Sequence, residues 1–332
     1  MFDADRYGSS RRVCWLKKVA LALAATVVTL ALGELALRWL SPYGLFAAGR
    51  ELHWKRESPR DLSGQYVIDP AFGFRPVLGA RYSEYGTLKN EYELEKDPAR
   101  QRLLFIGDSA TARRRIDTAL RNVYGSEGFE YWNAGVESFN TPQEVRYYEQ
   151  FNRAIKPDHV ILTFHNNDFE TTPVAFYDDG KLVVFSPHGR LGRISRTLFE
   201  HCILYRIVLG AWFLGGKQDE EIAAEVRDSL ARLRELTRED GIPLTVLLLP
   251  IMKPLDKWTP QEEKNHKQAR EILDALRIRT FDLTAPMVEA LKAGVEIQQI
   301  ENDHWHPTHK VSRWFAEYLQ REGLFTPKSH TR

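Results

Sequence analysis

Short apolar runs alternate with longer amphipathic stretches from residue 102 to near the end of the chain. Five apolar runs have the length and composition of buried strands, at residues 103–106, 129–132, 159–164, 244–249 and 278–281. Five other stretches show the apolar spacing of helices, at residues 116–124, 143–155, 220–239, 261–276 and 308–321. Strands that alternate with helices predict an α/β fold with a parallel sheet covered on both faces and right-handed crossovers.

The beginning of the chain has a different pattern. Residues 19–33 carry no charge, and four basic residues precede them within residues 11–18. These fifteen residues would span about 22 Å as a helix, so crossing the roughly 30 Å hydrocarbon core requires the helix to continue to Leu40. Glu34 and Arg38 then lie four residues apart, where they can pair and reach toward the membrane interface. Because basic residues stay in the cytoplasm, the pattern predicts one transmembrane helix with everything after it exported.

Two other interpretations of this segment remain open. Residues 31–33 form a small-x-small sequence, so the run could be a cleaved signal peptide, and a buried core helix would also be apolar. As an anchor, the run divides the chain into a cytoplasmic tail (1–18), a transmembrane signal anchor (19–40), a stalk and N-terminal extension (41–99) and an exported domain (100–326). In a bacterium, this describes a single-pass inner-membrane protein with its large domain in the periplasm or outside the cell. Cys14 and Cys202 then lie on opposite sides of the membrane and cannot form a disulfide.

Composition and charge narrow the possible functions. The chain has 332 residues, of which 43% are apolar, which is too many for a disordered protein. The net charge is only +1 and no block of like charge would suit a nucleic-acid-binding surface, so a nucleic-acid partner is not expected. Residues 169–216 fit no strand–helix unit and contain prolines and glycines, so we expect an insertion, or a lid over the edge of the sheet.

Polar residues follow the first three predicted strands directly. They are Gly107-Asp108-Ser109, Asn133-Ala134-Gly135 and His165-Asn166-Asn167-Asp168. A fourth motif, Asp303-x-x-His306, lies just before the last predicted helix, and Pro307 suits the start of that helix. Ligand sites in parallel sheets lie at the carboxyl ends of the strands, so we expect these motifs to lie close together.

In this order and spacing, the four motifs resemble those of the SGNH hydrolase superfamily, also called GDSL-like esterases. The resemblance covers about residues 100–325 and implies a three-layer α/β/α fold with a flavodoxin-like sheet. It assigns Ser109 as the nucleophile, His306 and Asp303 as the rest of a catalytic triad, and Ser109, Gly135 and Asn167 as the oxyanion hole. One position departs from the family pattern, because His165 stands where the third block has glycine.

The chemistry of these residue types agrees with the implied roles. A serine hydroxyl attacks an ester only when a base removes its proton, which His306 can do while Asp303 fixes its tautomer. The Ser109 N–H, the Gly135 N–H and the Asn167 amide can donate to the developing oxyanion, and a side chain at Gly135 would obstruct the substrate. Asp108 is expected to support the turn. No cofactor and no metal are required.

Other constellations were weighed against this one. His304, His306 and His309 have the density of a metal site, but a helix beginning at Pro307 would direct them differently. The glycine patterns of the α/β-hydrolase elbow, the P-loop and dinucleotide binding are missing from the sequence. Residues 113–115 are three arginines that either attract an anionic substrate or form a solvated helix face. Trp305 either stacks on a sugar or packs beneath its loop.

The leading hypothesis is an exported, membrane-anchored serine esterase acting on O-acyl esters of a carbohydrate or lipid. An O-acetyltransferase of an envelope polysaccharide would use the same triad, and the looser likeness to such membrane-bound proteins suggests polysaccharide-modification proteins as partners. A non-catalytic binding or assembly component of a polysaccharide machine is the alternative from another class. The sequence leaves the substrate, the acyl acceptor and the oligomeric state open.

Overall fold

The structure is a computed structural model that describes residues 4–40, 45–48, 51–54, 63–170, 172, 174–178, 181–185, 198, 201–205, 207–208, 219–300 and 303–325. It consists of two units. Met1–Asp61 with Phe176–Gly216 form the smaller unit, and Leu62–Ala175 with Lys217–Arg332 form the larger one.

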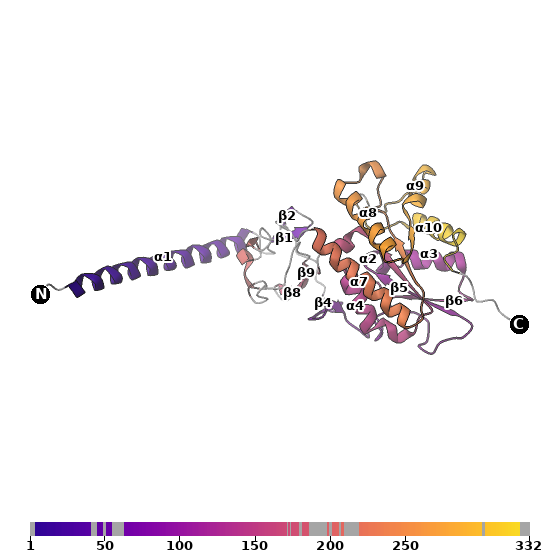
Figure 1. Ribbon diagram of the computed structural model, residues 1–332, viewed down its shortest axis with the longest axis horizontal. Coiled ribbons are helices and arrows are strands. Elements are labelled where there is room, and N and C mark those ends of the chain that lie inside the picture. The colour runs from indigo at the N-terminus through magenta and orange to yellow at the C-terminus, as the bar shows by residue number, and fades with distance from the viewer. Residues whose placement is uncertain are drawn as a thin grey trace. The chain divides into compact units, whose positions relative to one another are not determined.

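A five-stranded sheet forms the centre of the larger unit (Figure 1). Its strands are β5 (Gln101–Gly107), β6 (Phe129–Asn133), β7 (His159–Phe164), β10 (Leu244–Leu248) and β11 (Arg279–Asp282). Their order across the sheet is β11-β10-β7-β5-β6, and every neighbouring pair is parallel. Numbered along the chain, this is the 2-1-3-4-5 arrangement of flavodoxin-like sheets. The predicted fold is therefore confirmed, and each strand begins and ends within two residues of its expected limits.

Helices cover both faces of the sheet. α3 (Arg115–Tyr124), α9 (Thr284–Lys292) and α10 (His309–Arg321) share one apolar core, and α4 (Thr141–Gln150), α7 (Asp219–Glu239) and α8 (Pro260–Ala275) share the other. Alternate residues of β5 enter the two cores: Leu103 and Phe105 face one, and Leu104 and Ile106 the other. This alternation is the pleat of a strand buried on both faces, and it explains why β5 reads as a continuous apolar run.

Some elements were not predicted. They include the nine-residue helix α9, which contains Pro286. A two-stranded antiparallel sheet of β3 (Tyr66–Asp69) and β4 (Gly73–Pro76) lies in a region without evident periodicity. Two further short helices occur next to the site, α2 (Ser109–Ala112) and the 3-10 helix η2 (Asn166–Phe169). The helix expected at residues 143–155 is divided into α4 and the 3-10 helix η1 (Asn152–Ile155).

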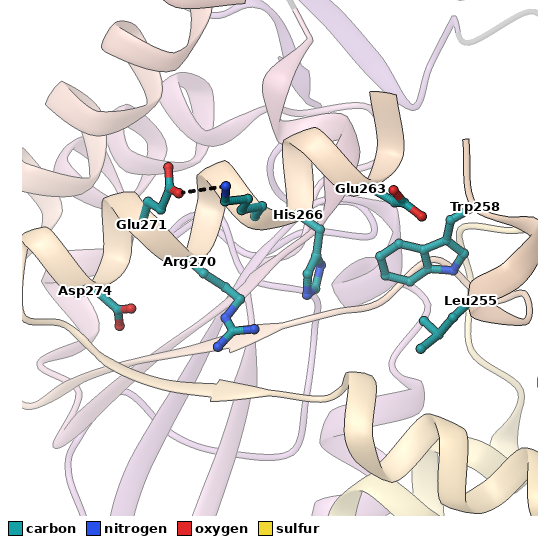
Figure 2. Close-up of a pocket in the computed structure, with 8 residues that line it drawn as sticks. Leu255, Trp258, Glu263, His266, Arg270, Glu271 and Asp274 are labelled. Carbon is teal, nitrogen blue, oxygen red and sulfur yellow. Dashed lines mark ion pairs between the residues drawn. The ribbon is translucent and has the colours of Figure 1, made fainter. Parts of the chain in front are cut away.

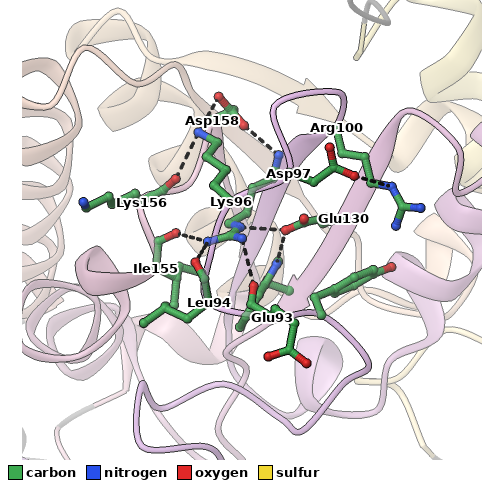
Figure 3. Close-up of polar contacts among 12 residues, drawn as sticks. Glu93, Leu94, Lys96, Asp97, Arg100, Glu130, Ile155, Lys156 and Asp158 are labelled. Carbon is green, nitrogen blue, oxygen red and sulfur yellow. Dashed lines mark hydrogen bonds and ion pairs between the residues drawn. The ribbon is translucent and has the colours of Figure 1, made fainter.

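The segment before β5 is attached to the sheet by Arg102, which is 1% exposed. Its guanidinium donates to Glu130 Oε2 at 2.6 Å and to the carbonyl oxygens of Ile155 and Glu93 at 2.6 and 3.0 Å (Figure 3). It also lies 4.8 Å above the Trp132 ring. A buried charge is tolerated when it is paired and hydrogen-bonded in this way. Residues 63–100 are accordingly a packed extension of the larger unit, whereas most of the stalk expected nearer the N-terminus lies outside the described residues.

The long helix α1 (Ala4–Leu40) belongs to the smaller unit. Its segment Trp15–Trp39 is long and apolar enough to cross a membrane, with a mean hydropathy of 2.1. Glu34 and Arg38 pair at 2.9 Å, as their spacing predicted. The Glu34 carboxylate also accepts the backbone N–H groups of Ile203 and Leu204, at 3.0 and 2.8 Å. Through Glu34, the end of the apolar helix thus binds the backbone of a segment within the insertion predicted at residues 169–216.

That insertion also contains two paired strands, β8 (Val174–Asp178) and β9 (Lys181–Phe185). Much of residues 186–218 lies outside the described part of the chain, and the lid role of the insertion stays a prediction.

Candidate active site

Ser109 lies where β5 turns into α2. The Asp108 side chain caps this helix by accepting the Ala110 N–H at 2.8 Å. Gly107 permits the turn, because its φ is +151° and a Cβ there would collide with the hydroxyls of Thr111 and Thr163. The sequence Gly-Asp-Ser therefore places the hydroxyl of Ser109 at the carboxyl end of β5, on the first residue of a helix.

His306 and Asp303 lie beside Ser109, although 197 residues separate the histidine from the serine. The distance from His306 Nε2 to Ser109 Oγ is 2.9 Å, and that from His306 Nδ1 to Asp303 Oδ1 is 2.7 Å. An ionised carboxylate only accepts hydrogen bonds, so Nδ1 carries the imidazole proton and Nε2 accepts from the serine hydroxyl. The three residues have the mutual geometry that base-assisted attack by a serine requires.

The protonation states suit this arrangement. Burial lowers the pKa of His306 and so does the positive charge of Arg113, and together they outweigh the hydrogen bond with Asp303, which raises it. Burial raises the pKa of Asp303, whereas the hydrogen bond and charge of His306 and the charge of Arg113 lower it. The lowering effects are the larger, so the pKa of Asp303 lies below its usual value. At neutral pH the pair is therefore a neutral imidazole beside a carboxylate, and the imidazole is ready to take a proton.

Asn167 lies in η2, directly after β7. Its side-chain Nδ2 donates to Asp108 Oδ2 at 2.7 Å, and its Oδ1 accepts from His165 Nδ1 at 3.2 Å. One amide hydrogen is used by Asp108, which leaves the second for another acceptor. Asp108 therefore does more than support its turn, because the same carboxylate caps the helix that begins at Ser109 and orients the Asn167 amide.

Gly135 follows β6, and its backbone N–H donates to Asn133 Oδ1 at 3.0 Å. A Cβ at Gly135 would meet the backbone of α2, with Thr111 C only 2.7 Å away and Ala112 N closer still. Glycine is thus required here because β6 ends against α2. The sequence had suggested a different reason, which was clearance for substrate. An oxyanion that used this N–H would have to replace the Asn133 oxygen.

His165 stands where the family pattern has glycine, and its side chain is buried. Its ring meets Trp305 edge-on, with the ring centres 5.2 Å apart, and burial lowers its pKa. Its backbone N–H donates to the buried Asp168 at 2.6 Å, which fixes the start of η2. Trp305 therefore packs on His165 while remaining 38% exposed.

The three arginines at residues 113–115 all bind protein groups. Arg113 Nη1 lies 3.3 Å from Asp303 Oδ2, Arg114 Nε lies 3.5 Å from Asp117 Oδ2, and Arg115 donates to the Pro307 carbonyl and to Gln299. Two of the three therefore contact the segment that supplies Asp303 and His306. The partners of Arg113 and Arg115 lie almost two hundred residues away along the chain, so no local pattern could indicate them.

The histidines of the competing metal site have separate partners. His304 Nδ1 lies 2.7 Å from Gln298 Nε2, His306 belongs to the triad, and His309 begins α10 in an exposed position. Among the described residues, no group of three or more histidine, cysteine, aspartate or glutamate side chains is arranged to hold a metal ion.

A hollow of about 480 Å³ lies along α8 (Figure 2). Trp258 and Leu255 form one end, and charged side chains of α8 form the rest. His266 at its centre bonds to Asp282 Oδ2 at 3.2 Å and to Thr284 at 3.1 Å. Ser109, His306 and Asp303 do not line this hollow.

No protein-family model matches the sequence, and no curated protein matches it. Several solved structures do match. An acetylxylan esterase from Geobacillus stearothermophilus has 16% identity and a TM-score of 0.44, and the match covers 70% of this chain and 97% of that one. An acetyl xylan esterase called AlAXEase has 13% identity and a TM-score of 0.44, with 67% and 98% covered. An alpha/beta hydrolase enzyme from the metagenome of Lake Arreo, Spain, has 13% identity and a TM-score of 0.46, with 68% and 96% covered.

The parallel sheet, with its flavodoxin-like strand order, is the fold that the four motifs implied. At these identities and TM-scores the likeness concerns the fold alone, and the roles of individual residues have to follow from the geometry of this chain.

Proposed function

We propose that this protein is a serine esterase in which Ser109 is the nucleophile, His306 the general base and acid, and Asp303 the group that orients His306. The observation that carries the proposal is the continuous set of hydrogen bonds from Asp303 through His306 to Ser109, at 2.7 and 2.9 Å. The side-chain amide of Asn167 is linked to this set because it donates to Asp108, the residue before Ser109.

The reaction follows from this geometry. Ser109 Oγ attacks the ester carbonyl as His306 Nε2 takes its proton, and the carbonyl oxygen becomes an oxyanion near Asn167 and the Ser109 N–H at the start of α2. The protonated His306 gives its proton to the departing alcohol, which leaves an acyl-serine. Water, or a second hydroxyl in a transferase, then attacks the acyl-serine with His306 again acting as the base.

The substrate class proposed is an O-acylated carbohydrate, with an acylated lipid as the alternative. Two of the matching structures are named acetylxylan esterases, and Trp305 offers an exposed aromatic ring two residues from Asp303. Transfer to an envelope polysaccharide by the same triad is the second candidate. A binding component without catalysis would use the same residues to bind its ligand and would leave Ser109 unreactive.

For the cellular setting, we propose a single-pass inner-membrane protein with its N-terminus in the cytoplasm and the larger unit in the periplasm. The long apolar helix α1 and the basic residues before its apolar stretch support this orientation.

The deciding experiment uses the full chain purified in detergent. It is treated with a fluorophosphonate probe and assayed on a chromogenic acetyl ester, alongside Ser109→Ala and the matched control Ser126→Ala in the loop before β6. We expect labelling and turnover in the wild type and the control, and neither in Ser109→Ala at an unchanged melting temperature. Full turnover in Ser109→Ala, or a wild-type protein that the probe does not label, would refute the assignment.

A further inference from the structure

We propose that Arg113 is a positioning residue of the active site: it binds the Asp303 oxygen that His306 does not use and places a fixed positive charge beside the His306–Asp303 pair. This inference rests on the proposed function. It assigns a role in this chain to one of the three arginines whose purpose the sequence left open.

The Asp303 carboxylate is held from both sides. Oδ1 accepts from His306 Nδ1 at 2.7 Å and from the Trp305 N–H at 3.3 Å, whereas Oδ2 faces Arg113 Nη1 at 3.3 Å. Rotation of the carboxylate about its Cβ–Cγ bond would break these contacts together. Arg113 therefore favours the orientation of the carboxylate plane in which one oxygen meets the imidazole and the other meets the guanidinium.

Arg113 occupies the C-cap position of α2, the helix that begins with Ser109. The ion pair thus joins the nucleophile's helix to the segment that carries Asp303 and His306. Arg115 makes a second connection by donating to the Pro307 carbonyl, directly after His306. Two arginines of one short segment therefore hold the two ends of residues 303–307 against the serine.

The charge of Arg113 acts on the general base as well. The titratable groups that face His306 are Asp303 and Asp108, which favour its protonated form, and Arg113 and the buried His165, which oppose it. Arg113 also draws part of the Asp303 charge away from the imidazole. Both effects have the same sign, so loss of Arg113 raises the pKa of His306.

The rival roles of Arg113 predict different results. An arginine that binds an anionic substrate would change KM for charged esters and leave the titration of His306 unchanged. An arginine on a solvated helix face would change neither. Arg113 is 38% exposed, and ion pairs this exposed contribute little to stability, so a substitution at this position is expected to leave the fold intact.

The test compares Arg113→Gln, Arg113→Lys and the matched control Arg114→Gln, in which the adjacent arginine pairs with Asp117 instead. The pH dependence of kcat/KM is measured on a neutral acetyl ester for each full-length protein. We expect the acid limb in Arg113→Gln to move toward higher pH by about half a unit to one unit. We expect Arg113→Lys to restore most of the wild-type profile, and Arg114→Gln to match the wild type.

The KM for the neutral ester should stay the same in all four proteins. NMR titration of the His306 ring in the Ser109→Ala background gives the same pKa shift without relying on turnover. An unmoved acid limb and unmoved ring titration in Arg113→Gln would overturn the proposal, and so would an equal shift in Arg114→Gln. Failure of the esterase assignment itself would appear separately, as a wild-type protein whose Ser109 is not labelled by the fluorophosphonate.

Discussion

The carboxylate of Asp108 accepts a hydrogen bond of 2.7 Å from the side-chain amide of Asn167. The same carboxylate caps the helix that begins at Ser109, with its other oxygen 2.8 Å from the Ala110 nitrogen. A single side chain therefore sets both the direction of the helix that begins at Ser109 and the direction of a proposed oxyanion donor. The oxygen of the Asn167 amide accepts a hydrogen bond from His165 Nδ1.

Replacement of Asn167 tests the oxyanion role. If its second amide hydrogen donates to the developing oxyanion, Asn167→Ala lowers kcat by roughly 10²- to 10³-fold with little change in KM, because the bond strengthens in the transition state. Asp108→Asn should lower kcat as well, since the amide of Asn167 loses the charged acceptor that orients it. Steady-state kinetics and melting temperature are measured together. A lowered melting temperature with an unchanged kcat would show that Asn167 only supports the turn.

Gly135 provides a steric test of how β6 meets the nucleophile's helix. A methyl group at this position would overlap the backbone of Thr111 and Ala112, so Gly135→Ala has to displace α2 or β6. We expect both a lower melting temperature and a loss of turnover. Gly128→Ala is the matched control, because a Cβ there meets nothing within 4 Å. Equal melting temperatures for the two variants would contradict this packing.

Glu144 should make the stability of the protein depend on pH. It is 3% exposed and both carboxyl oxygens lack a hydrogen-bond partner among the described residues. Burial raises its pKa, as do the nearby carboxylates of Asp168 and Asp108. A carboxyl group whose pKa is raised in the folded state destabilises that state increasingly as pH rises above the unfolded value.

Glu144→Gln removes this penalty while keeping the shape of the side chain. The melting temperature of Glu144→Gln minus that of the wild type should therefore become larger as the pH rises from 5 to 8. Glu149→Gln on the same helix, where Glu149 forms an exposed ion pair with Arg232, should show no such trend. A difference between Glu144→Gln and the wild type that stays constant with pH would show that Glu144 ionises normally.

The membrane anchor is tested by fractionation and topology. The full chain should sediment with membranes and resist extraction with carbonate, and a reporter fused to the C-terminus should be active outside the cytoplasm. The N-terminus of the isolated protein should be the original one. An N-terminus beginning at Glu34 would show instead that the apolar run is a cleaved signal peptide.

The sequence alone determined the architecture of the larger unit and the location of its candidate site. Buried parallel strands require continuous apolar runs, so the runs that became β5, β6 and β7 could be recognised without structural information. Since the carboxyl ends of parallel strands meet at one edge of the sheet, Ser109, Gly135 and Asn167 had to come together once the strands were assigned. The short helix α9 was missed because it contains Pro286, and a proline within a short run is not typical of a helix.

Only the tertiary structure decided which atoms meet at that edge. The contact of Arg113 with Asp303 and that of Gly135 with the α2 backbone depend on the angles at which helices and loops cross the sheet. The place of His165 beneath Trp305 depends on side-chain volume between segments that are far apart along the chain. Local apolar periodicity fixes which face of an element is buried, but the partner of each polar atom follows from packing in three dimensions.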